Sequence, residues 1–350
     1  MGIFSSKNFN SEVFGRYLET VPRVKQNAFI NAGILRSRAD LKTMLAEQTG
    51  GNQITVPMTG LIGGEALNYD GATDITATGM STFLQSMIVV GRAKAWEEKD
   101  FTKDITGKDF MEEVAAQVSN YWDDVDQATI LAELKGIFGV TANSFNTKHT
   151  LDITGNSGEA SKVGATTLNT AIQQAAGDNK NLFTMAIMHS EVATNLENMQ
   201  VLEYFKQTDA NGIQRSTGLA TWNGRTVLID DDVPTEIVPD SSDGVGDGYT
   251  KYTTYILGQN AFDYCDCGAA VPSEPYRDPK SAGGKEWLIT RQRKIFAPKG
   301  FSFVQPTSAI MSPTDEQLAT AARWTVVKSA DSASYFDSKA IPFARIISRG

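Results

Sequence analysis

Histidine and cysteine, which supply many catalytic groups and metal ligands, are scarce in this sequence. Its 350 residues include two histidines, His149 and His189, and two cysteines, Cys265 and Cys267. A single C-x-C with no second Cys or His pair nearby is weak evidence for a metal site, and two cysteines one residue apart make a poor structural disulfide. We therefore expect reduced cysteines in a strand or loop, with no metal and no cofactor.

Long apolar runs are missing as well. No uninterrupted stretch approaches the ~18 residues that a membrane-spanning helix needs, and the N-terminus lacks the basic-then-apolar layout of a secretory signal. Hydrophobic residues make up 41% of the chain and charged residues 21%, as in a globular protein. The net charge of −9 argues against tight, sequence-independent DNA binding, because such binding requires a basic surface.

The charges that are present occur in blocks of alternating sign. Residues 1–50 hold seven Lys and Arg against four Asp and Glu, residues 207–270 hold three against ten, and residues 275–299 hold seven against two. Such blocks can be plain solvated faces. They also suit a protein that docks its own copies in a fixed orientation, because complementary charges set the register of an interface.

The first hundred residues combine short elements with a long loop rich in Gly and Thr. The stretch SRADLKTMLAEQTGG reads as a short helix with Ser37 and Asp40 as a capping box, and segments 53–57 and 82–90 read as strands. No Lys or Arg occurs from 43 to 91. A structureless loop of this length usually has a role outside its own domain. Its apolar side chains are expected either to reach over a neighbouring molecule or to fold back: Leu61, Ile62, Leu67 and Tyr69.

A long helix is the clearest single element. Apolar residues recur at helical spacing from Thr106 to about Phe138, with Thr106 and Asp109 as a second capping box. Gly136 and Gly139 are expected to end it.

Residues 160–270 read as a compact α/β lobe with a small sheet. We expect a helix at 167–176, a strand at 183–188, a helix that Ser190 can cap, and the strands RTVLID and TTYILG. Residues 284–304 then read as a long strand pair with a turn at 298–300. The tail reads as the short helix SPTDEQLATAA followed by the strands WTVV and IPFARIIS.

Known catalytic motifs are absent from the sequence. There is no G-x-S-x-G, no H-E-x-x-H, no phosphate loop and no G-x-G-x-x-G. His149 lies in the polar stretch SFNTKHTLD, and His189 follows a strand at the start of a helix, where α/β sheets often place a functional residue. We expect His189 to be neutral and to donate to the backbone. The rival interpretation is a hydrolase that uses His189 with an acid from 230–232.

An acidic, Gly-rich loop follows the strand RTVLID. Clustered carboxylates with turn glycines can bind calcium, although the spacing matches no EF-hand, and the same residues are typical of a solvated surface turn. Both interpretations stay open for its seven acids: Asp230, Asp231, Asp232, Glu236, Asp240, Asp243 and Asp247.

In their order along the chain, these pieces resemble the major capsid proteins of tailed bacteriophages. The motifs that carry the resemblance are ITVPMTGLIGGEALNYDG, NLFTMAIMHSEVATNLEN, WNGRTVLIDDDVP and YTTYILGQNAF. The resemblance implies an α+β phage-capsid fold. Its parts would be an N-terminal arm (1–51), an extended β-hairpin loop with flanking strands (52–96), a peripheral domain with a spine helix (97–140) and return strands (284–306), an α/β axial domain (141–283), and a C-terminal segment (307–350) packing on the peripheral and axial domains.

The same resemblance implies a structural role and not an enzymatic one. Copies would join as hexamers and pentamers in an icosahedral shell that encloses double-stranded DNA, assembled in the host bacterial cytoplasm with a scaffolding protein and a portal. Contacts between subunits are expected on the loop residues named above and on these charged residues: Arg291, Arg293, Lys294, Asp230, Asp231 and Asp232. An encapsulin-like bacterial compartment shares the architecture and is the alternative, which gene neighbours would distinguish.

Two departures from other members of the resembled family lead to further expectations. Some relatives join subunits through an isopeptide bond from a lysine in the extended loop; here that loop contains no lysine, which predicts a non-covalent shell. Some relatives begin with a long, removable scaffolding segment. Only about fifty residues precede the loop here, so we expect a separate scaffolding protein and no large N-terminal removal.

Overall fold

The computed structural model describes residues 33–47, 51–60, 66–70, 74, 79–106, 110–208, 214–239, 248–329 and 334–350. The chain divides into two compact units. Unit 1 comprises residues 1–27, 91–127 and 268–292, and unit 2 comprises residues 28–90, 128–267 and 293–350. The division falls inside helix α5 (Phe110–Ile137) and inside strand β14 (Lys285–Pro298).

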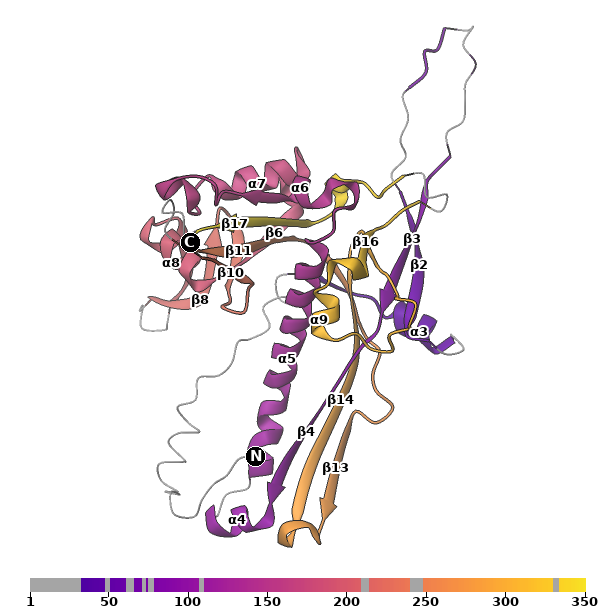
Figure 1. Cartoon of the computed structure of the whole chain (residues 1–350), viewed down its shortest axis with the longest axis vertical. Coiled ribbons are helices and arrows are strands. Elements are labelled where there is room, and N and C mark those ends of the chain that lie inside the picture. The colour runs from indigo at the N-terminus through magenta and orange to yellow at the C-terminus, as the bar shows by residue number, and fades with distance from the viewer. Residues whose placement is uncertain are drawn as a thin grey trace. The chain divides into compact units, whose positions relative to one another are not determined.

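Unit 2 contains an eight-stranded mixed sheet with strand order β5-β17-β11-β6-β9-β8-β7, to which β10 adds beside β11. The pairs β6 with β9 and β17 with β5 are parallel, and the other pairs are antiparallel. Figure 1 shows helices α6 and α7 along one side of this sheet. The strands are β5 (Thr150–Asp152), β6 (Phe183–Met188), β7 (Leu202–Thr208), β8 (Gln214–Trp222), β9 (Arg225–Ile229), β10 (Thr235–Val238), β11 (Tyr249–Gly258) and β17 (Phe343–Ser348).

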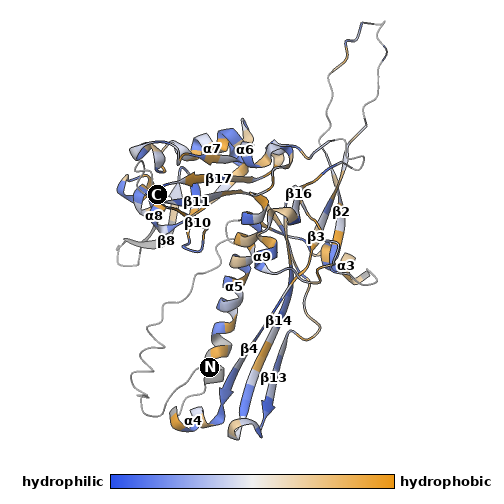
Figure 2. Cartoon of the chain, in the orientation of Figure 1, coloured by the Kyte–Doolittle hydropathy of each residue, from blue (hydrophilic) through white to orange (hydrophobic). Residues whose placement is uncertain are grey.

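Strand β6 is buried on both faces, which explains its nearly continuous apolar sequence FTMAIM. Met185 and Ile187 pack into one core cluster, while Ala186 and Met188 pack into another. The second cluster also takes the apolar stripes of helices α7 (Thr167–Ala176) and α8 (Ser190–Asn198), including Ile172. Figure 2 shows β17 as mainly hydrophobic and α7 as amphipathic. The sheet is therefore a core layer with helices against it, as the α/β lobe predicts.

The first core cluster gathers the carboxyl-terminal part of α5 and several short elements of unit 2. Ile130, Leu134 and Ile137 are fully buried from the α5 side. Packed with them are residues of α6 (Phe145–His149), β15 (Phe301–Phe303), α9 (Asp315–Leu318) and β16 (Trp324–Val326). A capping box at Thr314 and Gln317 starts α9.

A two-stranded hairpin, β2 (Gln53–Thr59) with β3 (Thr82–Ile88), carries the long loop on unit 2. Helix α3 (Asp40–Glu47) supplies the fully buried Leu41 to a third cluster with Ile54, Val56 and Met87. Strand β1 (Leu35–Ser37) pairs in parallel with β12 (Phe262–Asp266), and β12 pairs with β14 through Lys294–Pro298. The segment around α3 thus packs on other elements, because it is too short to form a core of its own.

Unit 1 is built on long strands and charged contacts. Strand β13 (Ser273–Asp278) pairs with β14 through Lys285–Thr290, and β4 (Val90–Lys99) also pairs with β14. Figure 1 shows these three strands side by side, with helix α4 (Asp100–Thr106) after β4. Among its described residues are the ion pairs of Arg277 with Asp100, Lys285 with Glu97, and Arg291 with Glu274. An edge-to-face chain of Trp96, Tyr121 and Trp122 packs the middle of α5 against β4.

Several expectations about elements need correction. The long helix predicted at 106–138 is α5, which starts later than expected, at Phe110, and ends at Ile137, between Gly136 and Gly139 as expected. Thr106 is the last residue of the separate helix α4, and Asp109 of the predicted capping box lies outside the described residues. Ser37 lies in β1 and not at a helix N-cap. The turn at 298–300 is where it was expected, but β15 pairs with β16, and the partners of β14 are β4, β12 and β13. In the part of the chain that the structure describes, no helix combines the length and apolar character required to cross a bilayer.

Candidate functional site

His189 is the N-cap residue of helix α8. It follows β6 in an extended conformation, and its Nδ1 accepts a hydrogen bond from the backbone N–H of Glu191 at 3.1 Å. The prediction that Ser190 caps this helix is therefore wrong, since Ser190 is the first helical residue. The expectation that His189 donates to the backbone is also wrong, because the ring nitrogen accepts. An accepting Nδ1 places the proton of the neutral ring on Nε2.

The structure brings His189 together with Asp231, a partner that the sequence left open among three acids. Strands β6 and β9 are parallel, so their carboxyl ends meet at one edge of the sheet. Asp231 Oδ1 accepts from the Ser190 N–H at 3.1 Å and lies 3.8 Å from His189 Nε2. Both ring nitrogens therefore face groups that hold the helix start. This geometry favours a structural corner over the general base of a hydrolase, whose acceptor nitrogen must face a nucleophile.

The acidic run after β9 is a turn. Asp230 is only 1% exposed, and its Oδ1 accepts from the Asp232 N–H at 2.9 Å, as in an Asx turn. Asp231 and Asp232 are exposed, and both also interact within the chain. Within the described residues, no group of three or more His, Cys, Asp or Glu could hold a metal ion. The three later acids of the calcium hypothesis lie outside the described residues: Asp240, Asp243 and Asp247.

The two cysteines are free thiols in or beside strand β12. Cys265 is buried in the third core cluster with Ile295. Cys267 is half-buried, and burial raises the pKa of its thiol to about 12. A thiol with so high a pKa is a poor nucleophile at neutral pH, which agrees with the expectation of reduced, structural cysteines.

His149 is the other correction, because it is buried and not in a polar loop. It ends helix α6, is 2% exposed, and stacks on Phe145 with ring centroids 4.5 Å apart. Its Nδ1 lies 2.7 Å from the Phe343 carbonyl oxygen and its Nε2 lies 2.8 Å from the Ser338 hydroxyl. Since a carbonyl only accepts, Nδ1 donates and Nε2 accepts. Burial lowers the pKa of this ring to about 4, so the histidine is neutral near pH 7.

The residues expected to contact other subunits are only partly described. On the long loop, Tyr69 is 92% exposed and Leu67 is also exposed, whereas Leu61 and Ile62 lie outside the described residues. On β14, both terminal nitrogens of Arg291 donate to Glu274 Oε2 at 3.2 Å. Arg293 is exposed and Lys294 is half-buried.

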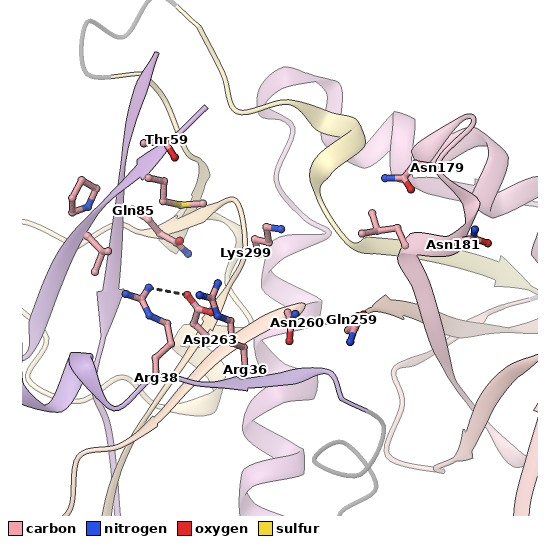
Figure 3. A pocket seen from close by; sticks show the side chains of 14 residues that line it. Arg36, Arg38, Thr59, Gln85, Asn179, Asn181, Gln259, Asn260, Asp263 and Lys299 are labelled. Atoms are coloured by element: carbon pink, nitrogen blue, oxygen red, sulfur yellow. Dashed lines mark hydrogen bonds and ion pairs between the residues drawn. The ribbon is translucent and has the colours of Figure 1, made fainter. Parts of the chain in front are cut away.

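A polar cavity of about 680 Å³ lies within unit 2, and sequence reasoning missed it. Figure 3 shows the side chains of Arg36, Arg38 and Lys299 around it, with Asp263 between the two arginines. Its other polar lining residues include four amides from two turns: Asn179, Asn181, Gln259 and Asn260. The available signal was Arg36-Ser-Arg38, because residues two apart on an extended chain point to the same side.

Comparison with known proteins shows which proteins have a similar sequence and architecture. No family model matches the chain. The major capsid protein of Bacillus phage SPP1 is 26% identical over 313 residues, which cover 89% of this chain and 90% of the relative.

Solved structures show the same fold at low sequence identity. The capsid of Ralstonia phage GP4 matches with a TM-score of 0.59 at 11% identity, over 95% of this chain and 93% of that one. The capsid of cyanophage Pam1 matches with a TM-score of 0.56 at 11% identity over 100% of both chains. The head of Helicobacter pylori bacteriophage KHP40 matches with a TM-score of 0.55 at 11% identity, over 100% of this chain and 95% of that one. Together, the sequence relative and the shared phage-capsid fold confirm the resemblance of this chain to the major capsid proteins of tailed bacteriophages.

Proposed function

We propose that this chain is a major capsid protein that assembles as hexamers and pentamers into an icosahedral shell around a phage genome. The observation that carries the proposal is the extent of the similarity. The phage-capsid fold spans 95% to 100% of the chain in three solved capsids or heads, and the curated sequence relative covers 89% of it. A match over the full chain is what a structural protein requires, because its function uses its whole surface and not one pocket.

Exposed apolar side chains give the proposal independent physical support. On unit 1, Phe101 is 65% exposed, and Ile105, Val271 and Tyr276 are exposed as well. On unit 2, Tyr69 and Met311 are among the most exposed large hydrophobic side chains. Burying apolar surface is the main favourable term in protein association, so these side chains are suited to contact with other copies.

The proposed contacts between subunits are of two kinds. The long loop would place Leu61, Ile62, Leu67 and Tyr69 across an adjacent subunit. The basic strand with Arg293 and Lys294 would face acidic surfaces of neighbours, where Asp231 and Asp232 are exposed. Arg291 is already paired with Glu274 in its own chain, so Arg293 is the stronger candidate on this strand.

The remaining parts of the proposal follow from the capsid role. The division into arm, extended loop, peripheral domain and axial domain would be the working division of the subunit in the shell. A scaffolding protein and a portal would be partners during assembly in the host cytoplasm, and the virion would be the final location. The enclosed double-stranded DNA would be held without sequence-specific binding, in agreement with the net charge of −9.

Electron microscopy of the purified chain, alone and with its candidate scaffolding protein, tests the proposal. We expect closed shells, or rings of six and five subunits, in at least one of the two conditions. A uniform population of small compact particles in both conditions would contradict the capsid role, and the corner formed by His189 and Asp231 would then be re-examined.

A further inference from the structure

The polar cavity of unit 2 has a cationic lining whose charge is only partly balanced within the chain. Arg38 donates to Asp263 Oδ2 at 3.1 Å through Nη1 and to the carboxylate of Asp40 through Nε and Nη2. These hydrogen bonds raise the pKa of Arg38 and lower the pKa of Asp40. The guanidinium of Arg38 is therefore neutralised by two carboxylates of its own chain.

Arg36 and Lys299 are the cations that remain. Neither side chain makes an ion pair or a hydrogen bond with another residue that the structure describes. Arg36 is exposed and lies opposite Asp263 in the register of β1 and β12, but the ion pair of Asp263 is with Arg38. Lys299 is half-buried in the turn between β14 and β15. An ammonium that has no partner among the described residues can still donate to an incoming anion.

The backbone around these two cations is held in place by buried hydrogen bonds. Gln85 is 1% exposed, and its amide donates to the carbonyls of Pro298 and Phe301 at 2.9 and 3.0 Å, on either side of Lys299. The Lys299 N–H donates to Ala261. Arg36 is fixed by the pairing of β1 with β12. The turn residues Gln259 and Asn260 are tied to Leu182 and Gly33. The backbone that carries the two cations is therefore fixed, which lowers part of the entropic cost of binding.

We infer that this cavity receives a carboxylate side chain of a second copy of the chain. A volume of about 680 Å³ is large enough for a protruding side chain with its flanking residues. Guanidinium, ammonium and amide N–H groups are the donors that recognise a carboxylate. Other copies supply suitable groups in excess, because the chain has 41 Asp and Glu against 32 Lys and Arg.

The alternative anion in a phage head is nucleic acid. A duplex backbone is bound by a basic stripe or patch that follows many phosphates. Here, two cations sit in a recess among amides on an acidic chain, which fits one carboxylate better. The inference rests on the proposed function, since a shell supplies the second copy.

Zero-length cross-linking of assembled particles tests the inference directly. A carbodiimide adds to a carboxylate to form an O-acylisourea, the amine of Lys299 attacks its acyl carbon, and the urea leaves as the amide bond forms. The linked side chains have together lost one water, which the urea carries. Particles would be assembled from an equal mixture of unlabelled and ¹⁵N-labelled chains, together with the scaffolding protein where assembly needs it. Mass spectrometry then separates links within a chain from links between chains.

We expect a Lys299 peptide linked to an Asp or Glu peptide of opposite isotope, in assembled particles and not in the unassembled chain. Particles in which Lys299 stays unlinked, or links only within its own chain, would overturn the inference and leave the capsid role intact. Lys299 that is shielded in DNA-filled particles but free in empty ones would identify nucleic acid as the occupant, and would also overturn it. Failure of the wild-type chain to form any particle would instead remove the proposed function, and the inference with it.

A set of variants distinguishes the effect of the positive charge from an effect on folding. Lys299→Met and Arg36→Met are each expected to lower the yield of closed particles by about tenfold, the loss typical of one charged hydrogen bond. Lys299→Arg should assemble like the wild type but lose the cross-link, because a guanidinium does not form the amide. Lys180→Met is the matched control: Lys180 is an exposed cation between Asn179 and Asn181 that does not line the cavity. Wild-type yields for Lys299→Met and Arg36→Met would overturn the inference.

Discussion

A neutral histidine in a sealed environment makes the stability of this chain depend on pH. His149 is held between the Phe343 carbonyl, the Ser338 hydroxyl and the ring of Phe145. The ordinary pKa of histidine is 6.5, and burial lowers that of His149 to about 4 in the folded chain. Between these two values the unfolded chain binds a proton that the folded chain does not. Stability therefore falls as the pH drops from 6.5 to 4, with no loss from this group above 6.5.

The first prediction is a loss of about 3 kcal/mol in the free energy of unfolding from His149 between pH 7 and pH 4. The measurement is urea denaturation of the unassembled chain across this range. His149→Asn can keep a donor near the Phe343 carbonyl but has no group that titrates in this range. We expect its free energy of unfolding to be lower than that of the wild type at pH 7 and to change less with pH. Wild-type and His149→Asn curves that stay parallel over the whole range would show that His149 does not titrate as described.

The second prediction concerns His189, whose side chain caps α8 by accepting from Glu191. Replacing a good N-cap with alanine usually costs about 1 kcal/mol, and asparagine is among the best caps. We expect His189→Ala to lose about that amount in urea denaturation, and His189→Asn to match the wild type in stability and in particle yield. Equal losses in the two variants would show that the ring has a role other than accepting this hydrogen bond.

At the scale of elements, local pattern predicted those segments whose burial is decided by their own sequence. Helix α7 and strand β6 have the predicted bounds, because Leu168, Ile172 and Ala175 form a clear helical stripe and FTMAIM is a short, wholly buried strand. The pairing of β15 with β16 and of β1 with β12 could not be predicted in the same way. Strands β1, β15 and β16 are each only three residues long. Their pairing depends on contacts with residues far away in the sequence.

Gly136, the last residue but one of α5, is required by packing as well as by the end of the helix. Glycine commonly follows a helix, but here it lies inside α5 because another part of unit 2 approaches too closely for a side chain. A Cβ at this position would lie 2.1 Å from the Leu318 carbonyl oxygen and 2.6 Å from Trp324 Nε1. That same Trp324 N–H donates to Leu318 at 2.7 Å, and Trp324 is buried. This hydrogen bond holds the two neighbours together, so a Cβ at position 136 would clash with both.

The third prediction follows from that contact. On helix propensity alone Gly136→Ala would gain about 1 kcal/mol, but overpacking typically costs 1–3 kcal/mol and the contacts here are short, so we expect a net loss of roughly 2 kcal/mol. Gly155→Ala is the matched control, because nothing lies within 4 Å of its Cβ position, and its stability should change by less than about 0.5 kcal/mol. Thermal unfolding of both variants makes the comparison. A stabilised Gly136→Ala would mean that α9 and β16 move apart easily.

At the scale of the whole molecule, the order of the pieces was predictable and their contact surfaces were not. The sequence of loop, long helix, α/β lobe and return strand is a property of the chain, and it was enough to identify the resemblance that the comparisons confirm. The cavity around Arg36 and Lys299 is made of residues from strands β1, β2, β3 and β12 and from the turns between other elements, which only folding brings together. A site assembled from distant strands and turns leaves almost no local pattern.

The fourth prediction concerns the chemistry of the shell. No lysine occurs from 43 to 91, so the loop cannot supply the amine of an isopeptide bond between subunits. Mature particles boiled in denaturant should therefore run as a single band at the mass of one chain, without a ladder. Treatment with the carbodiimide described above is the positive control, since it should create such a ladder. A ladder in untreated particles would contradict the prediction and would direct the search to lysines elsewhere in the chain.

The fifth prediction tests the basic strand as a contact between copies. Arg293 is exposed on β14, whereas both terminal nitrogens of Arg291 are committed to Glu274. Reversing a charge at an interface replaces attraction by repulsion and acts most at low salt. We therefore expect Arg293→Glu to lower the yield of particles several-fold at low ionic strength, with partial recovery as salt is added.

Arg291→Glu should act differently, because it places a second carboxylate beside Glu274. Its main effect should be lower stability of the unassembled chain, measured by thermal unfolding, and the double variant Arg291→Glu with Glu274→Arg should restore that stability. Lys280→Glu, at an exposed position after β13, is the control for a general change in net charge and should assemble normally. If Arg293→Glu assembles as well as Lys280→Glu at every salt concentration, the basic strand is an ordinary solvated face, and the attraction between subunits must come from the apolar loop and the cavity of Arg36 and Lys299.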